Sequence, residues 1–406
     1  MERITDTVFH GGREAHLYKY QNGMKKAVND GRITEQDSIL IKSFLSEIQA
    51  CNDISAMRIY KLSYQLIGMR KWLPPFVEIT TSVLFAGIED YKNNSGYKDN
   101  TQGDMIKILK RFLIWLVESE EANPGLNIAK IGKIKAKTVT KTKTAEDVLT
   151  KTEVDAIFKA ASSTRNRAIL ELLYESAGRI GEICTLQWSQ ITFYNTHASV
   201  HLSGKTGKTR VVPLYTSHVI LRRWRDQYSG GTPKPTDLVF PSKLGCSKPL
   251  WYNSVQYMIE QAAKRAGIER KVNPHIFRHS KITHYKQDGI SDSTVKMLAW
   301  GDIGSNMLST YAHLTVDDAD RELMQFHGIV PAEELSQSDD ALTPQQCKQC
   351  GMLNPQSNEF CGGCGFPLRS DTANTMAELQ RVIDTDPDLL QRIAHMLQPS
   401  KKQPET

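Results

Sequence analysis

The sequence lacks the features that would place a protein in a membrane or outside the cell. No apolar stretch approaches the ~18 residues that a membrane span requires. The first residues, MERITD, have neither the basic start nor the apolar core of a signal peptide. Charge of neither sign dominates, because 51 Lys and Arg face 45 Asp and Glu among the 406 residues. We therefore expect a soluble protein of the cytoplasm.

A disulfide framework is also missing. Three of the seven cysteines are isolated, and the other four are crowded into the pattern Cys347-x2-Cys350-x10-Cys361-x2-Cys364, with a glycine after each pair. In a reducing compartment such crowding indicates a metal site rather than disulfides. The spacing is typical of a compact zinc ribbon with a structural Zn²⁺. A redox-active pair is the alternative, and two CxxC pairs at this interval favour zinc.

The length and the hydrophobic spacing predict several domains of mainly helical structure. A chain of 406 residues exceeds what one hydrophobic core usually organises. Apolar residues recur at helical spacing within 105–117, whereas 198–203 and 209–214 have the pattern of two strands around a turn. We expect a mainly α fold with a small antiparallel β-sheet, of the α+β class. The predicted segments are a helical domain over 1–125, a lysine-rich linker over 126–150, a mixed domain over 151–330, an acidic linker over 331–346, a zinc ribbon over 347–368 and a helical tail over 369–406.

Seven lysines are interleaved with Thr and Ile after the helical half: Lys130, Lys133, Lys135, Lys137, Lys141, Lys143 and Lys151. Taken alone, this run fits two interpretations equally well. One is a solvated linker. The other is a linker that lies along a phosphate backbone, where each neutralised phosphate releases counterions and contributes affinity.

The turn over 177–182 (AGRIGE) separates two helical patterns. Glu182 follows Arg179 by three residues, so the two share a helical face and the carboxylate can orient the guanidinium. Without further signals this is a surface ion pair.

The segment 204–210 (GKTGKTR) connects the two predicted strands. It predicts a β-hairpin with Lys205 and Lys208 at its tip. The two glycines resemble part of a phosphate-binding loop, but the Walker spacing is absent and no helix follows directly. A basic hairpin tip that contacts nucleic acid is therefore favoured over a nucleotide site.

The segment 273–279 (NPHIFRH) predicts the start of a helix. Asn273 suits the N-cap and Pro274 the first helical position, so His275 and Arg278 fall in the first turn. Free N–H groups and the helix dipole favour an anion there. A structural histidine, or a zinc pair of His275 with His279, is the alternative, and phosphate is the better ligand.

Trp300 and Tyr311 flank a further helical stretch that leads into Tyr311-Ala312-His313-Leu314. A single tyrosine usually serves packing. In this order, however, Arg-x-x-Glu, the Gly-Lys hairpin, His-x-x-Arg and Tyr-x-His resemble the catalytic domain of the tyrosine recombinase (phage-type integrase) family. The resemblance covers 146–330, and the helical half looks like that family's core-binding domain.

Three short segments of the sequence look most like the archaeal branch of that family, whose members sometimes carry a zinc ribbon. They are residues 273–280, 311–314 and 327–329. Trp300 stands where most members carry a histidine and some carry a tryptophan. The spacing from Trp300 to Tyr311 is longer than the common bacterial pattern. This leaves open which subunit's tyrosine serves which active site.

The resemblance implies a role for each matching residue. Arg179 and Arg278 would clamp the scissile phosphate, Lys205 would protonate the leaving 5′-oxygen, His275 would assist, and Tyr311 would be the nucleophile. The chemistry is sound, because a phenol with a pKa near ~10 is protonated at neutral pH and needs such help. Two arginines can stabilise the added charge of the transition state, and His and Lys can move protons. No metal or nucleotide cofactor is implied for catalysis.

The resemblance implies a site-specific DNA recombinase that integrates, excises or resolves a mobile or viral element. Its partners would be a double-stranded DNA attachment site and three further copies of the chain, which form a tetramer on two DNA sites. Without DNA the protein would be a monomer or a weak oligomer. The linker would then lie on DNA, and the expected contacts are Lys133, Lys135, Lys137, Lys141, Lys143 and Lys208. The expected location is the nucleoid. The alternatives are a type IB topoisomerase-like enzyme and a regulator on an inactive recombinase scaffold.

Overall fold

The computed structural model divides the chain into two compact units, Met1–Thr142 and Lys143–Thr406. It describes residues 12–52, 54–136, 148–203, 208–228, 231–242, 248–311 and 342–385, leaving out the side chains of 309–311. Across those ranges, no helix is both long enough and apolar enough to cross a bilayer.

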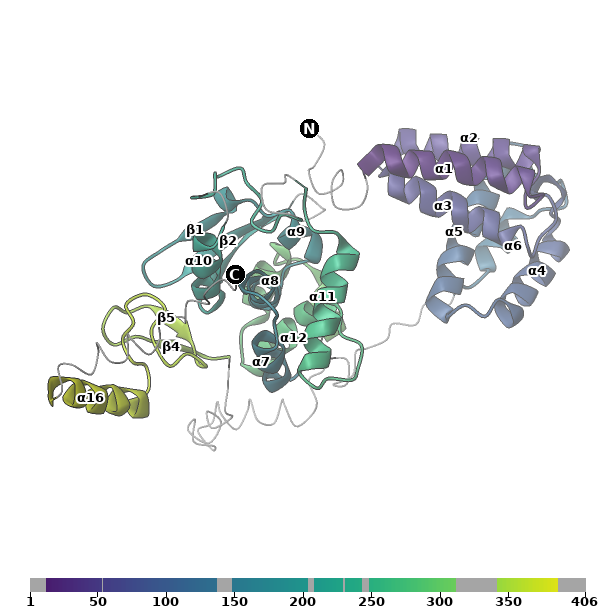
Figure 1. The fold of residues 1–406 in the computed structure, drawn as a ribbon. Helices are drawn as coiled ribbons and strands as arrows, with labels where there is room; N and C mark the ends of the chain where they lie inside the picture. Colours follow the sequence, from purple (N-terminus) through teal and green to yellow (C-terminus); the bar gives the residue numbers. More distant parts are fainter. Residues whose placement is uncertain are drawn as a thin grey trace, which may run out of the picture. The chain divides into compact units, whose positions relative to one another are not determined.

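The first unit is helical, as its hydrophobic spacing predicts (Figure 1). Its elements are α1 (Gly12–Asn29), α2 (Glu35–Cys51), α3 (Ala56–Met69), η2 (Phe76–Glu78), α4 (Thr81–Asn94), α5 (Asp99–Glu118) and α6 (Ile128–Lys133). Thr34 and Asp37 form a capping box that starts α2. The same Asp37 accepts hydrogen bonds from Arg70 Nε (2.7 Å) and from the backbone N–H of Phe76 (2.8 Å). One buried carboxylate thus ties α2 to the turns that follow α3.

The short helix α6 belongs to the core of the first unit. Ile131 is fully buried and Ile134 is 8% exposed, and both join the same apolar cluster as α2, α3 and α5. Lys110 Nζ donates to the carbonyl oxygen of Ile134 (2.6 Å) and holds the chain there. The segment predicted as a linker over 126–150 therefore begins as packed structure.

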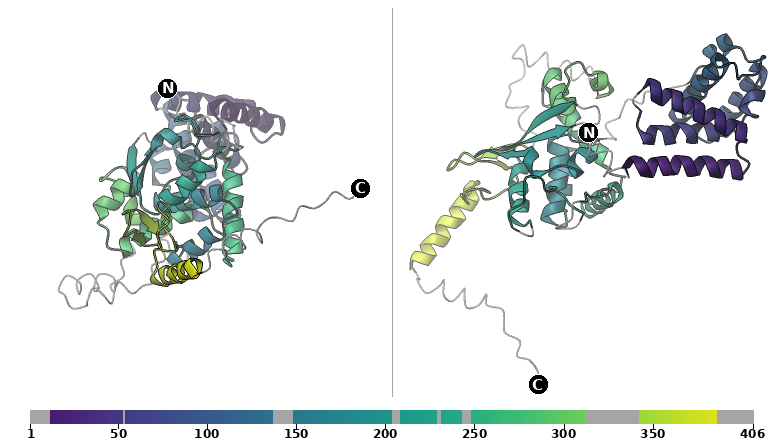
Figure 2. Two further views of the ribbon diagram at one scale, coloured as in Figure 1. Left: turned by 60° about the vertical axis from the view of Figure 1, so that its left-hand side comes forward. Right: turned by 90° about the horizontal axis from the view of Figure 1, so that it is seen from above.

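The second unit is built around α8, a helix that is buried on all sides from Ala168 to Glu175. It packs against α7, α10 and α12 (Figures 1 and 2). The helical elements of this unit are α7 (Lys151–Lys159), α8 (Thr164–Glu175), α9 (Ile180–Cys184), η4 (Trp188–Gln190), α10 (Ser217–Asp226), α11 (Tyr252–Arg265), α12 (Pro274–Gln287), α13 (Asp292–Trp300) and η5 (Asn306–Tyr311).

A three-stranded antiparallel sheet in the order β1-β2-β3 lies at one edge of these helices (Figures 1 and 2). Its strands are β1 (Ile191–Phe193), β2 (Ala198–Ser203) and β3 (Thr209–Leu214). The register runs from Ala198 opposite Leu214 to Ser203 opposite Thr209. The predicted strand pair is confirmed with its bounds, and β1 is a third strand that was not predicted.

After residue 341 the chain forms a small hairpin of β4 (Pro344–Gln346) and β5 (Leu353–Pro355), then α16 (Ser370–Thr385). No residue of α16 is buried. The prediction of a mainly helical fold with a small antiparallel sheet is confirmed. The helical stretch predicted between Trp300 and Tyr311 is the short helix η5, and residues 312–314 lie outside the described residues.

Candidate active site and metal centre

The first residue of the candidate active site, Arg278, is the fifth residue of α12 and so lies just beyond the first turn in which it was predicted. Asn273 caps this helix by accepting hydrogen bonds from the backbone N–H groups of residues 275 and 276, and Pro274 takes the first position. Arg278 is only 4% exposed. Its Nη1 donates to the carbonyl oxygen of Ala177, and its Nη2 donates to that of Ala299 (2.8 Å). One guanidinium thus joins three segments that are far apart in the sequence.

These contacts bring the loop of Arg179 and the ring of Trp300 toward Arg278. Ala177 precedes Arg179 by two residues and has a φ of +46°, a left-handed conformation that is uncommon for alanine. Ala299 precedes Trp300, whose ring centroid lies 5.2 Å from Arg278 Cζ, in cation–π contact. The loop of Arg179, the start of α12 and the end of α13 therefore converge.

Arg179 is oriented by Glu182, as its spacing predicts. Arg179 Nη1 donates to Glu182 Oε1 (3.0 Å), and its backbone N–H donates to Oε2 (2.8 Å). The Arg179 side chain keeps 41% of its surface exposed, whereas that of Glu182 keeps 4%. A half-exposed guanidinium on a buried carboxylate is held in place and still presented to an anion.

Arg210 completes this arrangement and was not predicted. It lies on β3 with its side chain 2% exposed, and Nη1 and Nη2 donate to the two oxygens of Glu182 (3.1 and 2.6 Å). Burial alone would raise the pKa of Glu182, but the hydrogen bonds and charges of Arg210 and Arg179 outweigh it, and the pKa is lowered. Glu182 is therefore an anion that bridges two arginines.

The hairpin strands meet the end of α13 at Gly301. This residue has a φ of +66°, and a Cβ added there would lie 2.7 Å from the carbonyl oxygen of Thr209. Beside it, Lys208 forms an ion pair with Asp302. Lys208 is thus in a protein contact as well as near the predicted hairpin tip. Lys205 lies outside the described residues.

His275 and Tyr311 complete the predicted set. His275 is exposed in the first turn of α12, with its ring centroid 6.3 Å from that of His279. Tyr311 is the last residue of η5, which packs on α12. Leu308, three residues earlier, is 4% exposed and shares an apolar cluster with Ala177 and Ala299. The backbone that carries Tyr311 is therefore anchored beside the arginine loop.

A further histidine in this region serves packing. His284, on α12, is 3% exposed, and its Nδ1 lies 2.7 Å from Tyr174 Oη in hydrogen-bond contact. Burial, with the charges of Lys151 and Lys281, lowers the pKa of His284 to about 4. It is neutral near pH 7 and is a structural histidine, in contrast to the exposed His275.

Together these groups suit transfer of a phosphoryl group. Arg179 presents a half-exposed, oriented guanidinium that can bind non-bridging oxygens, and the buried Arg278 holds the loop of Arg179 through Ala177. A helix N-terminus with a histidine adjoins them, and a tyrosine is carried on a neighbouring segment. Such donors can stabilise negative charge that develops on the non-bridging oxygens.

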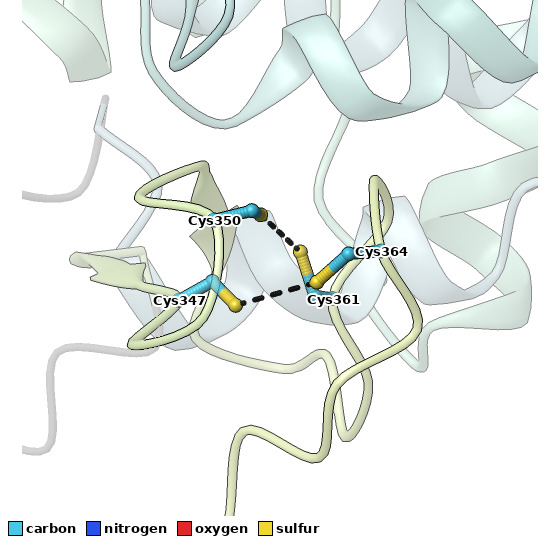
Figure 3. Close-up of side chains that lie close together, drawn as sticks. All are labelled: Cys347, Cys350, Cys361 and Cys364. Carbon is cyan, nitrogen blue, oxygen red and sulfur yellow. Dashed lines mark hydrogen bonds between the residues drawn. The ribbon is translucent and has the colours of Figure 1, made fainter.

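The four clustered cysteines form a separate candidate metal centre (Figure 3). Cys347 Sγ lies 3.7 Å from Cys364 Sγ, and Cys350 Sγ lies 3.6 Å from Cys361 Sγ. All four sulfurs are within 4.8 Å of one another. Four thiolates at Zn–S distances of ~2.3 Å in a tetrahedron stand ~3.8 Å apart, so the donor set fits zinc.

The two cysteine loops repeat one backbone pattern. The N–H of Cys347 donates to Met352 O (2.9 Å) and that of Cys361 to Phe366 O (2.8 Å). A glycine after each pair, Gly351 and Gly365, has a φ of +73° in both loops. This repetition presents two sulfurs from each loop toward one point.

Hydrogen bonds favour the thiolate form of Cys361. Burial alone would raise its pKa, but N–H donors, including those of Cys364 and Gly363, lower the pKa of the thiol to about 6. Metal binding requires the thiolate, so these donors assist at Cys361, whereas burial and hydrogen bonds with neighbouring thiols raise the pKa of Cys350 and Cys364.

Comparison with known proteins places this site in context. Residues 147–317 match the phage integrase family. Tyrosine recombinase XerC of Xylella fastidiosa (strain 9a5c) is 34% identical over 152 residues, 37% of this chain and 49% of XerC. Tyrosine recombinase XerD of Proteus mirabilis is 27% identical over 301 residues, 70% of this chain and 91% of XerD. The chain thus spans about half the length of the XerC relatives it matches.

Solved structures share the fold. Lambda integrase (residues 75–356) bound to DNA has a TM-score of 0.52 and 19% identity, and covers 68% of this chain and 97% of its own. A lambda integrase tetramer bound to a Holliday junction has a TM-score of 0.51 and 18% identity, and covers 66% and 79%. At these identities the comparison establishes the fold of the chain.

Proposed function

We propose that this chain, whose residues 147–317 match the phage integrase family, is a tyrosine-type site-specific DNA recombinase. One observation carries the proposal. Arg278 bridges the carbonyl oxygens of Ala177 and Ala299, and so joins the loop of Arg179 to the end of α13. The segment that carries Tyr311 packs on the same helix, α12. The similarity to XerC and XerD supports the same activity.

The proposed mechanism is the one that the family resemblance implies, and the described positions of Arg179, Arg278 and His275 support it. Arg179 and Arg278 bind the non-bridging oxygens of the scissile phosphate and stabilise the charge that develops. Tyr311 Oη attacks phosphorus, and the phenolic proton passes to His275. The bond to the 5′-oxygen breaks, and Lys205 protonates that oxygen. The 3′-phosphotyrosyl product keeps the phosphodiester energy, and attack by a 5′-hydroxyl of a partner strand releases the tyrosine.

A suicide duplex tests the activity. A nicked duplex that carries the attachment sequence of the element from which the gene comes should trap a covalent adduct, visible on a denaturing gel. Recombined or catenated products of supercoiled plasmid then separate strand exchange from topoisomerase-like relaxation. Binding without any adduct would instead support the inactive regulator, and relaxation alone would support the topoisomerase.

The lysine-rich segment is proposed to lie on DNA. Lys133 and Lys135 are described and exposed, and Lys137, Lys141 and Lys143 lie outside the described residues. By contrast, Lys151 is paired with Asp288 (2.6 Å) and is better left unchanged in a test.

Replacing the five lysines from Lys133 to Lys143 by glutamine should flatten the salt dependence of DNA affinity. The slope of log K against log salt is negative, and each lost phosphate contact reduces its magnitude by about 0.9. If all five lysines contact phosphates, the magnitude falls by about 4.5. Replacing the same five by arginine keeps the charge and should leave the slope unchanged. An unchanged slope in the glutamine variant would return the segment to a solvated linker.

The proposed partners are duplex DNA and further copies of the chain. The lambda integrase structures are a DNA complex and a tetramer on a Holliday junction. By analogy, four copies would act on two DNA sites in the cytoplasm, at the nucleoid. The cysteine centre is proposed to hold a structural Zn²⁺, as the sulfur spacing supports. The sequences of residues 273–280 and 311–314 support membership of the archaeal-like branch of the family.

A further inference from the structure

The cysteine knuckle, residues 344–367, makes specific contacts with the rest of the second unit. The backbone N–H of Leu353 donates to the carbonyl oxygen of Thr196, in the turn between β1 and β2 (3.0 Å). His218, in the first turn of α10, donates from Nε2 to the carbonyl oxygen of Leu353 (2.8 Å). Both backbone polar groups of one knuckle residue are therefore bound by the folded unit.

A close approach marks the same interface on the second cysteine loop. A Cβ added at Gly362 would lie 2.4 Å from Val219 Cγ1, far inside the contact distance of two carbons. The φ of Gly362 lies outside the left-handed region, so its backbone conformation would accept alanine. Contact with α10 is what requires glycine at this position.

The interface is continuous with the cysteine cluster. Asn354 is fully buried next to Leu353. Its Oδ1 accepts from the N–H of Gly362 (2.8 Å), and its Nδ2 reaches Cys361 Sγ at 3.6 Å. The residues that contact α10 are thus held by the side chain that binds a cluster sulfur. A cation that fixed the sulfurs would therefore also fix the residues that contact α10.

On the other side, the knuckle contacts a turn that is itself tied to the arginine loop. His218 and Ser217 are both fully buried. Glu175, the last residue of α8, accepts hydrogen bonds from the N–H groups of Tyr215 (2.7 Å), Thr216 (2.9 Å) and Ser217 (2.8 Å). Glu175 stands two residues before Ala177, whose carbonyl oxygen binds Arg278.

We propose that the metal-loaded cysteine knuckle is an integral part of the second unit. A soft divalent cation, Zn²⁺ by its ligand set, joins the two cysteine loops, and the joined loops dock on Thr196, His218 and Val219. Loss of the metal releases this surface and loosens the first turn of α10. The proposal does not depend on the reaction that the protein catalyses.

A double-mutant cycle at the contact tests the docking. In the full-length, zinc-loaded protein, Gly362→Ala should speed amide hydrogen exchange of Leu353, and of residues 215–222, at least about tenfold. Val219→Ala removes the methyl groups that the new Cβ meets, and it should have little effect alone. Combined with Gly362→Ala, it should restore slow exchange. Additive effects of the two changes would overturn the docking.

Metal removal tests the coupling in the unaltered chain. We expect one zinc per chain by elemental analysis, and none in Cys350→Ser with Cys364→Ser, which removes one ligand from each loop. Zinc stripped by a chelator should speed exchange in 344–367 and also in 194–198 and 215–222, and added zinc should reverse it. Faster exchange confined to 344–367 would make the knuckle an independent module and overturn the proposal, as would full-length protein that binds no zinc.

Discussion

Replacing Tyr311 by phenylalanine is expected to lower the yield of covalent DNA adduct by at least ~10³-fold, because no other group replaces a lost nucleophile. The ring is kept, so the packing of η5 through Leu308 beside Ala177 should persist. DNA affinity should stay close to that of the unaltered protein, since no cation is removed. The measurement is adduct on a nicked suicide duplex, at a protein concentration that saturates binding.

A matched control removes a different phenol. Tyr257, on α11, is 64% exposed, and Tyr257→Phe should leave the adduct yield unchanged. Adduct formation by Tyr311→Phe near the original yield would assign the nucleophile to another residue. Loss of the adduct in both variants would mean that the assay reports folding rather than chemistry. Only loss confined to Tyr311→Phe supports the proposed mechanism.

Local signals predicted the elements that carry the candidate site. The strands 198–203 and 209–214 were found with their bounds because alternating apolar residues flank a glycine-containing turn. The start of α12 was found because Asn273 and Pro274 are a strong N-terminal signal. In both places the chain within a few residues determines the structure.

Apolar periodicity was less visible where charged residues interrupt it. The linker prediction over 126–150 missed α6, because lysines are interleaved with its buried face. Leu126, Ile131 and Ile134 nevertheless enter the core of the first unit. Of these three residues only Ile131 lies within α6, and Leu126 and Ile134 enter the core from the turns on either side, so their burial follows no helical repeat.

Contacts between distant segments could not be predicted. Nothing near Ala177 in the sequence indicates its positive φ or its bond to Arg278, which lies 101 residues away. The contact of Leu353 with His218 joins residues 135 positions apart, and no local sequence signal indicates it. Arg210 had a usable signal, since alternation on β3 places it on the same buried face as Val212 and Leu214. A charge on the buried face of a strand calls for a buried partner.

The buried partner of Arg210 is Glu182, and breaking this pair is expected to lower the stability of the protein strongly. Arg210→Met should lower the free energy of unfolding by about 3–5 kcal/mol, because it leaves a buried carboxylate with one half-exposed arginine. The measurement is urea unfolding of the second unit. Lys159→Met is the control, since Lys159 is 59% exposed in its pair with Asp155. Removal of an exposed cation should cost at most about 1 kcal/mol.

The double variant Arg210→Met with Glu182→Gln separates stability from orientation. It removes the uncompensated charge, so it should recover most of the lost stability. It should not recover the rate of adduct formation, because Arg179 then lacks the carboxylate that orients its guanidinium. Recovery of the rate together with stability would mean that Glu182 and Arg210 serve the fold alone. A stable variant that binds DNA and cleaves slowly would establish them as positioning residues for Arg179.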